Sequence, residues 1–239
     1  MVQAILFDLF ETLITESGDP PAGVSSLAPA LGCERAAFRP QWKSRRPAVL
    51  AGRLSFRQAL EEIAVGLGSQ PDQATLQRIC DDRVRAKGRP FKHIETHILS
   101  TIENLRRQGL RLAVVSNCCA EDVVSWPQCS LASLFDCTVF SFEVGVAKPD
   151  PAIYLEAARR LNVEVSDIWF IGDGQDEELP GAQHAGLRAF RALWFQKRWP
   201  HYCEASSSAT DLSGIEETLA YVEHSLESVD GTSTPAERQ

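Results

Sequence analysis

The chain has 239 residues, of which 44% are hydrophobic and 23% charged, as in a globular protein large enough to bury a full core. Its 32 acidic residues outnumber its 24 basic residues, and the net charge of −8 argues against binding to nucleic acid or to an anionic membrane. Apolar runs such as 112–115 are far shorter than the roughly 20 residues that cross a bilayer. The lack of a signal-like start and of any CxxC pair among the seven cysteines predicts a cytoplasmic protein with reduced thiols.

Five short runs rich in apolar and β-forming residues predict strands. They cover residues 4–8, 111–115, 137–141, 168–172 and 188–193. Several are almost continuously apolar, which is typical of strands that are covered on both faces. Between them, apolar residues repeat at helical spacing over 94–105, and Asp150 followed by Pro151 is a typical helix start. This alternation predicts an α/β fold with a Rossmann-like parallel sheet.

The long stretch between the first two strands contains no convincing strand. Ser55 and Gln58 have the spacing of a capping box, which predicts a helix over 55–68, and a second helix is predicted over 71–88. Segments rich in proline, glycine and charge bracket this stretch. We predict a core formed by 1–16 and 91–227, an inserted helical subdomain formed by 17–90, and a disordered tail over 228–239. The alternative is that the extra helices pack onto a single domain.

Polar side chains follow four of the predicted strands. Asp8 follows the first, Ser116 and Asn117 the second, Lys148 comes after the third, and Asp173 and then Glu178 follow the fourth. In open parallel sheets, ligands bind at the carboxyl ends of the strands. We therefore expect these side chains to share one pocket.

The expected set suits attack by a carboxylate on a substrate, followed by hydrolysis of the covalent intermediate. Asp8 is the candidate nucleophile. Asp8, Asp173 and Glu178 offer the oxygen ligands that Mg²⁺ prefers. Lys148 adds a positive charge beside these carboxylates and contacts the group being transferred, and the Ser116 hydroxyl is a candidate donor to a phosphate oxygen.

Four motifs, in this order along the chain, resemble those of the haloacid dehalogenase superfamily of hydrolases. They are ILFDLFETL at 5–13, VVSN at 114–117, KPDP at 148–151 and IGDGQDEELPGA at 171–182. The resemblance covers residues 1–193 and implies a Rossmann-like core with a helical cap at 17–90. It also implies an aspartyl intermediate at Asp8, and usually Mg²⁺ and phosphatase activity on a small metabolite. It adds Asn117 to the substrate-binding residues and the backbone carbonyl of Phe10 to the metal ligands.

Two residues depart from the family pattern of phosphatases. Phe10 stands where a second aspartate normally protonates the leaving group, and Glu11 stands where glycine is usual. Losing a general acid typically costs ~10²–10⁴ in rate. Whether Glu11 takes over the proton transfer is left open by the sequence.

Three functions remain open at this point. We favour a Mg²⁺-dependent phosphatase acting on a small phosphorylated metabolite, because acids occupy both metal positions, Asp173 and Glu178. The alternatives are a metal-independent 2-haloacid dehalogenase, whose family branch carries an aromatic residue at the Phe10 position, and a catalytically weak binding or regulatory protein. The expected partner is a small-molecule substrate, with no nucleic acid and no membrane. The sequence predicts neither the substrate nor the oligomeric state.

Some polar and aromatic residues could have either a functional or a structural role. Arg45 and Arg46 either reach an anionic substrate or form a solvated basic face, and the second is favoured. Cys118 and Cys119 are expected to be buried structural residues. An aromatic cluster after the last predicted strand lines the site entrance, forms a partner surface or packs against the C-terminal helix; its members are Trp194, Phe195, Trp199, His201 and Tyr202.

Overall fold

A computed structural model gives the architecture of the chain, and it describes residues 1–16, 23–198 and 209–230. Six parallel strands form one sheet in the order β3-β2-β1-β4-β5-β6. The strands are β1 (Ala4–Phe7), β2 (Arg111–Ser116), β3 (Cys137–Phe140), β4 (Ile168–Gly172), β5 (Arg188–Ala192) and β6 (Thr210–Leu212). The predicted α/β fold with a parallel sheet is confirmed.

The sixth strand is the main correction to the predicted elements. β6 is not among the five strands predicted from the sequence, and it pairs with β5 at the edge of the sheet. It has three residues, and only Leu212 is buried. An edge strand this short carries almost no periodic pattern, which is why the sequence did not predict it.

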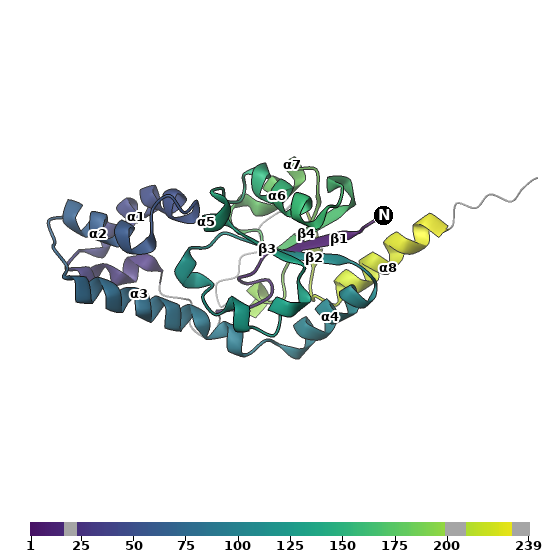
Figure 1. Cartoon of the computed structure of the whole chain (residues 1–239), viewed down its shortest axis with the longest axis horizontal. Helices are drawn as coiled ribbons and strands as arrows, with labels where there is room; N and C mark the ends of the chain where they lie inside the picture. Colours follow the sequence, from purple (N-terminus) through teal and green to yellow (C-terminus); the bar gives the residue numbers. More distant parts are fainter. Residues whose placement is uncertain (17–22, 199–208, 231–239) are drawn as a thin grey trace, which may run out of the picture.

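Helices cover both faces of the sheet (Figure 1). α4 (Thr96–Arg107) and α8 (Glu217–Asp230) lie on one face, and α6 (Pro151–Leu161) and α7 (Glu178–His184) on the other. Alternate residues of β1 enter the two cores: Ile5 and Phe7 pack on the α4 side, and Ala4 and Leu6 on the α6 side. This two-sided burial explains why the strand is continuously apolar.

Short helical segments make up the rest of the core. They are α5 (Ser141–Val144) and the 3₁₀ turns η2 (Pro90–Lys92), η3 (Ala120–Asp122), η4 (Trp126–Gln128), η5 (Ala132–Leu134), η6 (Val165–Asp167), η7 (Gln175–Glu177) and η8 (Gln196–Arg198). Within the described part of the chain, none of the helices is long and apolar enough to span a bilayer.

A group of helices with its own hydrophobic cluster lies between β1 and β2. We call residues 24–88 the helical segment; it contains η1 (Val24–Leu31), α1 (Arg35–Leu50), α2 (Phe56–Gly66) and α3 (Gln73–Gly88). It occupies the left end of the molecule in Figure 1, away from most of the sheet. The predicted capping box is present, because Ser55 Oγ accepts from Gln58 N while Gln58 Oε1 accepts from Ser55 N.

The limits of the predicted parts stay predictions. No helix was predicted over α1, which contains Pro40 and Pro47, and Phe38 and Val49 on its inner face are buried. α8 continues to Asp230, past the predicted start of the tail at 228, and 231–239 lie outside the described residues.

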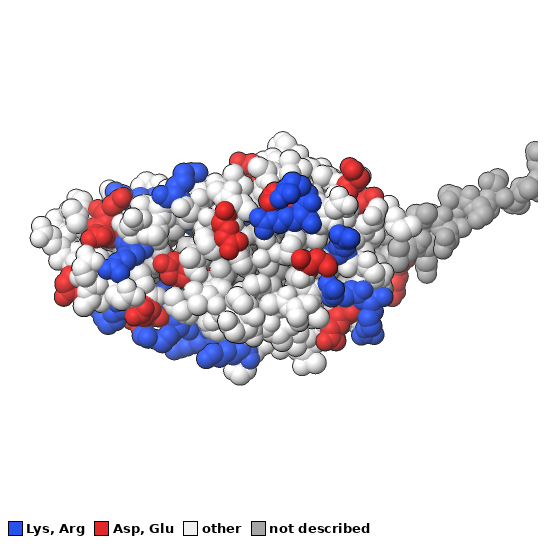
Figure 2. Space-filling view, in the orientation of Figure 1, with Lys and Arg blue, Asp and Glu red and all other residues white. Residues whose placement is uncertain are grey.

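On the face drawn in Figure 2, acidic and basic side chains are interspersed.

Candidate active site

The carboxyl ends of the central strands bring Asp8, Ser116 and Asp173 to one edge of the sheet. β1 lies between β2 and β4, and Phe7 is in register with both Val114 and Ile171. The Asp8 backbone N–H donates to the Ile171 carbonyl at 2.8 Å, so the β1–β4 pairing continues through the candidate nucleophile. All three polar side chains are buried.

Lys148 completes the centre from the loop between α5 and α6. Its buried ammonium donates to Asp8 Oδ1 and to Glu178 Oε2. Asn117 fixes the backbone of this loop: its side-chain oxygen accepts from Lys148 N at 2.7 Å, and its amide donates to the Lys148 carbonyl at 2.9 Å. Asn117 therefore positions Lys148 in this structure, while a contact of Asn117 with substrate stays a prediction.

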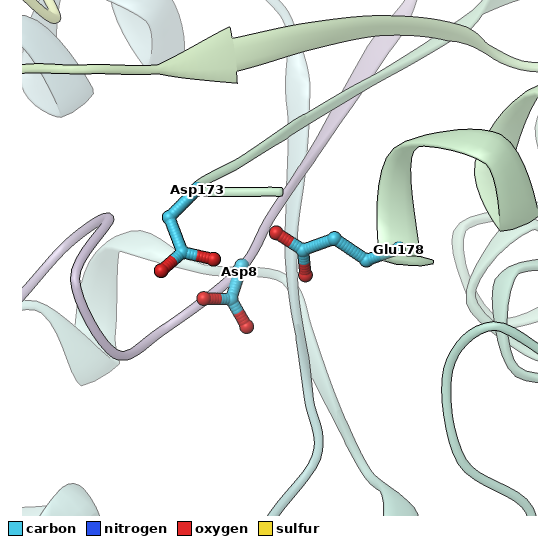
Figure 3. Close-up of side chains that lie close together, drawn as sticks. All are labelled: Asp8, Asp173 and Glu178. Atoms are coloured by element: carbon cyan, nitrogen blue, oxygen red, sulfur yellow. The ribbon is translucent and has the colours of Figure 1, made fainter. Parts of the chain in front are cut away.

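The carboxylates of Asp8, Asp173 and Glu178 point toward one another (Figure 3). One oxygen from each lies within 4.8 Å of those of the other two. Asp173 and Glu178 are held in place by the backbone, because Asp173 Oδ1 accepts from Gln175 N and Glu178 Oε1 from Gly174 N, each at 2.9 Å. The three acids come from the ends of β1 and β4 and from the start of α7.

The burial of these carboxylates makes their charged forms costly. Desolvation raises the pKa of Asp8 to about 7, against the opposing effect of Lys148, and in the same way raises the pKa of Glu178 to about 7. Desolvation and the charge of Asp8 raise the pKa of Asp173 to about 6. Burial alone would lower the pKa of Lys148, but the two carboxylates it contacts raise it.

These observations fit a site for Mg²⁺. The donor atoms are carboxylate oxygens, which a hard cation prefers, and the Lys148 ammonium contacts two of the three acids, Asp8 and Glu178. A divalent ion held by Asp8, Asp173 and Glu178 would supply the missing charge. The Phe10 backbone carbonyl, two residues after Asp8, stays a predicted fourth ligand.

The Ser116 hydroxyl is a buried polar group in need of a partner. Its Oγ has no hydrogen-bond partner among the described residues, although Ser116 is buried and lines the same cavity as Asp8. Leaving such a group unsatisfied costs about 1–3 kcal/mol. A ligand oxygen in the cavity would satisfy this hydroxyl, as the sequence predicted for a phosphate oxygen.

The cavity above the acids has a volume of about 270 Å³ and is lined by both the core and the helical segment. Phe10 contributes to its wall. The Lys87 ammonium lies 4.5 Å from the centroid of the Phe10 ring and pairs with Glu16 Oε1 at 2.7 Å. The Phe10 side chain thus packs against the Lys87 ammonium and has no proton to donate to a leaving group.

The Glu11 carboxylate accepts hydrogen bonds from residues close to it in the sequence. Its two carboxylate oxygens accept from Thr15 Oγ1 and from the Glu16 backbone N–H, each at 2.8 Å. Its φ of 59° lies in the left-handed region, where glycine is favoured. This backbone conformation gives a physical reason for glycine at this position in the family pattern. The engaged carboxylate argues against Glu11 as the replacement proton donor.

Three ion pairs join the helical segment to the rest of the chain around the cavity. Arg46 Nη2 contacts Asp176 Oδ2 at 2.6 Å, Arg83 Nη2 contacts Asp122 Oδ1 at 2.7 Å, and Lys87 contacts Glu16. Arg46 therefore lines the site paired with an acid rather than forming a purely solvated face, whereas Arg45 pairs with Glu62 inside the helical segment. No pattern in the sequence pointed to Arg83, Lys87 or Asp122.

The other residues that the sequence singled out have packing roles where they are described. Cys118 and Cys119 are buried, and the Cys119 thiol donates to Asp122 Oδ2. Trp194 and Phe195 are buried, and the Trp194 ring N–H donates to the Thr12 carbonyl at 2.9 Å. Trp199, His201 and Tyr202 lie outside the described residues.

The family of the chain follows from its match to a sequence model. Residues 2–186 match the haloacid dehalogenase-like hydrolases, so the chain belongs to this family of hydrolases. Two solved structures share its fold over almost their whole length. They are a phosphatase of this family from Thermococcus onnurineus (TM-score 0.62, 19% identity, 92% of this chain and 98% of that one) and an L-2-haloacid dehalogenase from Xanthobacter autotrophicus (TM-score 0.59, 21% identity, 93% and 99%).

Curated relatives include both kinds of enzyme. A glyceraldehyde 3-phosphate phosphatase from Methanopyrus kandleri is 35% identical over 97 residues, which is 39% of this chain and 41% of that protein. The (S)-2-haloacid dehalogenase 2 from Pseudomonas sp. (strain CBS-3) is 28% identical over 149 residues, 60% of this chain and 61% of that protein. The matched region spans less than two thirds of the length of each.

Proposed function

We propose that the protein is a Mg²⁺-dependent phosphatase that acts on a small phosphorylated metabolite through an aspartyl-phosphate at Asp8. The observation that carries the proposal is the convergence of three buried carboxylates, Asp8, Asp173 and Glu178, within 4.8 Å of one another. The phosphatases among the relatives and structural neighbours support it.

The proposed reaction has two steps at phosphorus. The Asp8 carboxylate attacks the phosphorus atom, the ester oxygen leaves with the bonding electrons and takes a proton from water, and a second water hydrolyses the acyl phosphate. Lys148 and the Ser116 hydroxyl would hold phosphoryl oxygens while Asp8 attacks. Bound Mg²⁺ would supply positive charge to the same oxygens. The helical segment would act as a cap that excludes bulk water.

An activity screen tests this proposal. Purified protein with Mg²⁺ and a panel of phosphate monoesters should release inorganic phosphate, and excess chelator should abolish the release. The Asp8→Asn protein provides the background rate. A broad panel that gives no release above that background would overturn the proposal.

The raised carboxyl pKa values predict that Mg²⁺ binding is coupled to proton release. In the metal-free protein the pKa values of Asp8 and Glu178 are about 7 and that of Asp173 is about 6, so these groups carry protons as the pH falls below 7. Mg²⁺ must displace these protons, and its affinity should fall steadily from pH 8 to pH 5. Calorimetry in buffers of different ionisation enthalpy measures the protons released. A pH-independent affinity would contradict the site.

Phe10→Asp should raise the rate on alkyl phosphates, because it places a carboxyl group two residues after the nucleophile. A positioned general acid contributes ~10²–10⁴ in rate, and we expect at least about a tenfold rise in kcat, since Lys87 would also pair with the new carboxylate. Phe10→Asn is the matched control, because it makes the same change in size without a carboxyl group. Equal rates for the two variants would contradict the prediction.

A metal-independent dehalogenase is the second candidate, and the surroundings of Asp8 favour it in two ways. The Lys148 ammonium already contacts both Asp8 and Glu178, so part of the charge that Mg²⁺ would supply is present. Phe10 provides an apolar wall beside Asp8, and an alkyl halide needs no proton on its leaving group. Halide release from a short 2-haloacid, unchanged by chelator, would establish this function in place of the first.

A further inference from the structure

Two residues that line the same cavity each have a buried donor atom with no hydrogen-bond partner among the described residues. One is Ser116 Oγ at the end of β2, and the other is Nε of Arg83 on α3. Both residues line the cavity that contains Asp8. Buried donors are almost always satisfied in folded proteins, and leaving one unpaired is costly. Two such donors, one from the sheet and one from the helical segment, indicate a ligand with an acceptor at each end.

The Arg83 side chain is held in place before any ligand arrives. Its guanidinium carbon lies 4.4 Å from the centroid of the Phe56 ring, and Nη2 contacts Asp122 Oδ1 at 2.7 Å. Asp122 is itself fixed, because its Oδ2 accepts from the backbone N–H of Cys119 at 3.1 Å. Asp122 Oδ1 has no aligned hydrogen bond, so the contact is an ion pair that leaves guanidinium N–H groups for another acceptor.

The charge around Arg83 selects the kind of acceptor. Asp122 already balances much of the guanidinium charge, and the other two cations of the helical segment that line the cavity, Arg46 and Lys87, are paired with Asp176 and Glu16. A second phosphate would bring two negative charges to this wall. A carboxylate brings one, and its two oxygens match the planar fork of an arginine. The cavity volume of about 270 Å³ has room for a small phosphate ester.

We infer that the substrate is the phosphate ester of a short hydroxy acid, with its phosphoryl group at Asp8 and Ser116 and its carboxylate on Arg83. This inference rests on the proposed phosphatase function and names the class of substrate for it. Arg83 is then the residue that distinguishes acidic from neutral esters.

A matched pair of esters tests the inference. 3-Phosphoglycerate and glycerol 3-phosphate have the same carbon chain and phosphoryl group, and they differ only in a carboxylate or a hydroxymethyl group at the far end. We expect kcat/KM to be about 10- to 100-fold higher for 3-phosphoglycerate, the usual effect of a charge-assisted hydrogen bond. Arg83→Met should bring this ratio close to 1, mainly by raising KM for the acid.

Two further variants separate recognition from folding. Arg85→Met is the matched control, because Arg85 lies on the same helix, is exposed and pairs with Asp82, so its loss should leave the ratio unchanged. Arg83→Met leaves Asp122 buried without its cation, which can destabilise the protein. The double variant Arg83→Met/Asp122→Asn removes both charges and should also give a ratio close to 1.

The outcomes distinguish the inference from the function on which it rests. If the wild-type protein hydrolyses both esters equally, or if Arg83→Met keeps the preference for the acid, the inference is wrong while the phosphatase function stands. If the whole panel of phosphate monoesters, these two included, gives no phosphate release above the Asp8→Asn background, the proposed function fails and the inference fails with it.

Discussion

Asp8→Asn should abolish phosphate release while leaving the fold intact. The amide has nearly the same size as the carboxylate, but it lacks the charged oxygen that would attack phosphorus, so we expect a loss on the order of 10⁴-fold or more in kcat. Asp8 lies at the end of a fully buried strand and donates its backbone N–H to Ile171, and neither feature depends on the side chain.

Steady-state phosphate release from the best ester of the panel measures this effect. Circular dichroism and thermal unfolding of the variant check that the protein is folded. Asp150→Asn is a suitable control, because Asp150 is exposed, caps α6 and is not one of the three clustered acids, and asparagine is also a good N-cap. An Asp8→Asn protein with more than a tenth of the wild-type rate would show that Asp8 is not the nucleophile.

Lys148→Met should cause the second largest loss. The ammonium contacts Asp8 and Glu178, and it lowers the pKa of both carboxyl groups against the effect of burial. Without it the pKa of Asp8 is higher still, so at neutral pH Mg²⁺ has to displace a more tightly held proton and less of the protein carries the charged Asp8 that attacks. We expect a loss on the order of 10²–10³-fold in kcat/KM at pH 7, from this effect and from the lost contact with the phosphoryl group.

The pH profile separates this charge effect from a general loss of structure. In the variant, the rise of kcat/KM with pH should move to higher pH, because a larger pKa of Asp8 keeps the carboxyl protonated over a wider range. Lys92→Met, which removes an exposed lysine, should leave both rate and profile unchanged. A Lys148→Met profile that only drops in height, without moving, would contradict the assigned role of Lys148.

The sequence predicted the centre of the site because parallel strands end at one edge. β1, β2 and β4 are buried on both faces, so each produces a continuous apolar run, and the polar residue after each run must lie at the same edge. Glu178 and Lys148 followed from motif spacing. The resulting cluster of Asp8, Lys148 and Glu178 is the part of the structure that the sequence predicted best.

The cavity wall could not be predicted in the same way. Arg83 and Asp122 meet because α3 packs against η3, and nothing in the local sequence of either element encodes that contact. The two prolines of α1 argue against a helix at the level of the sequence, whereas burial of Phe38 and Val49 stabilises the helix in the structure. Glu11 was left open as a proton donor, and only its contacts with Thr15 and Glu16 indicate a structural role.

The most direct test of the account is to trap the covalent intermediate. The protein is mixed with a hydrolysed phosphate ester, quenched in acid within a turnover, and digested, and the peptide containing Asp8 is examined by mass spectrometry. We predict a peptide heavier by one phosphoryl group, with the modification on Asp8 and absent from the Asp8→Asn protein. Rapid hydrolysis with no modified peptide, or with the phosphoryl group on another residue, would contradict nucleophilic attack by Asp8.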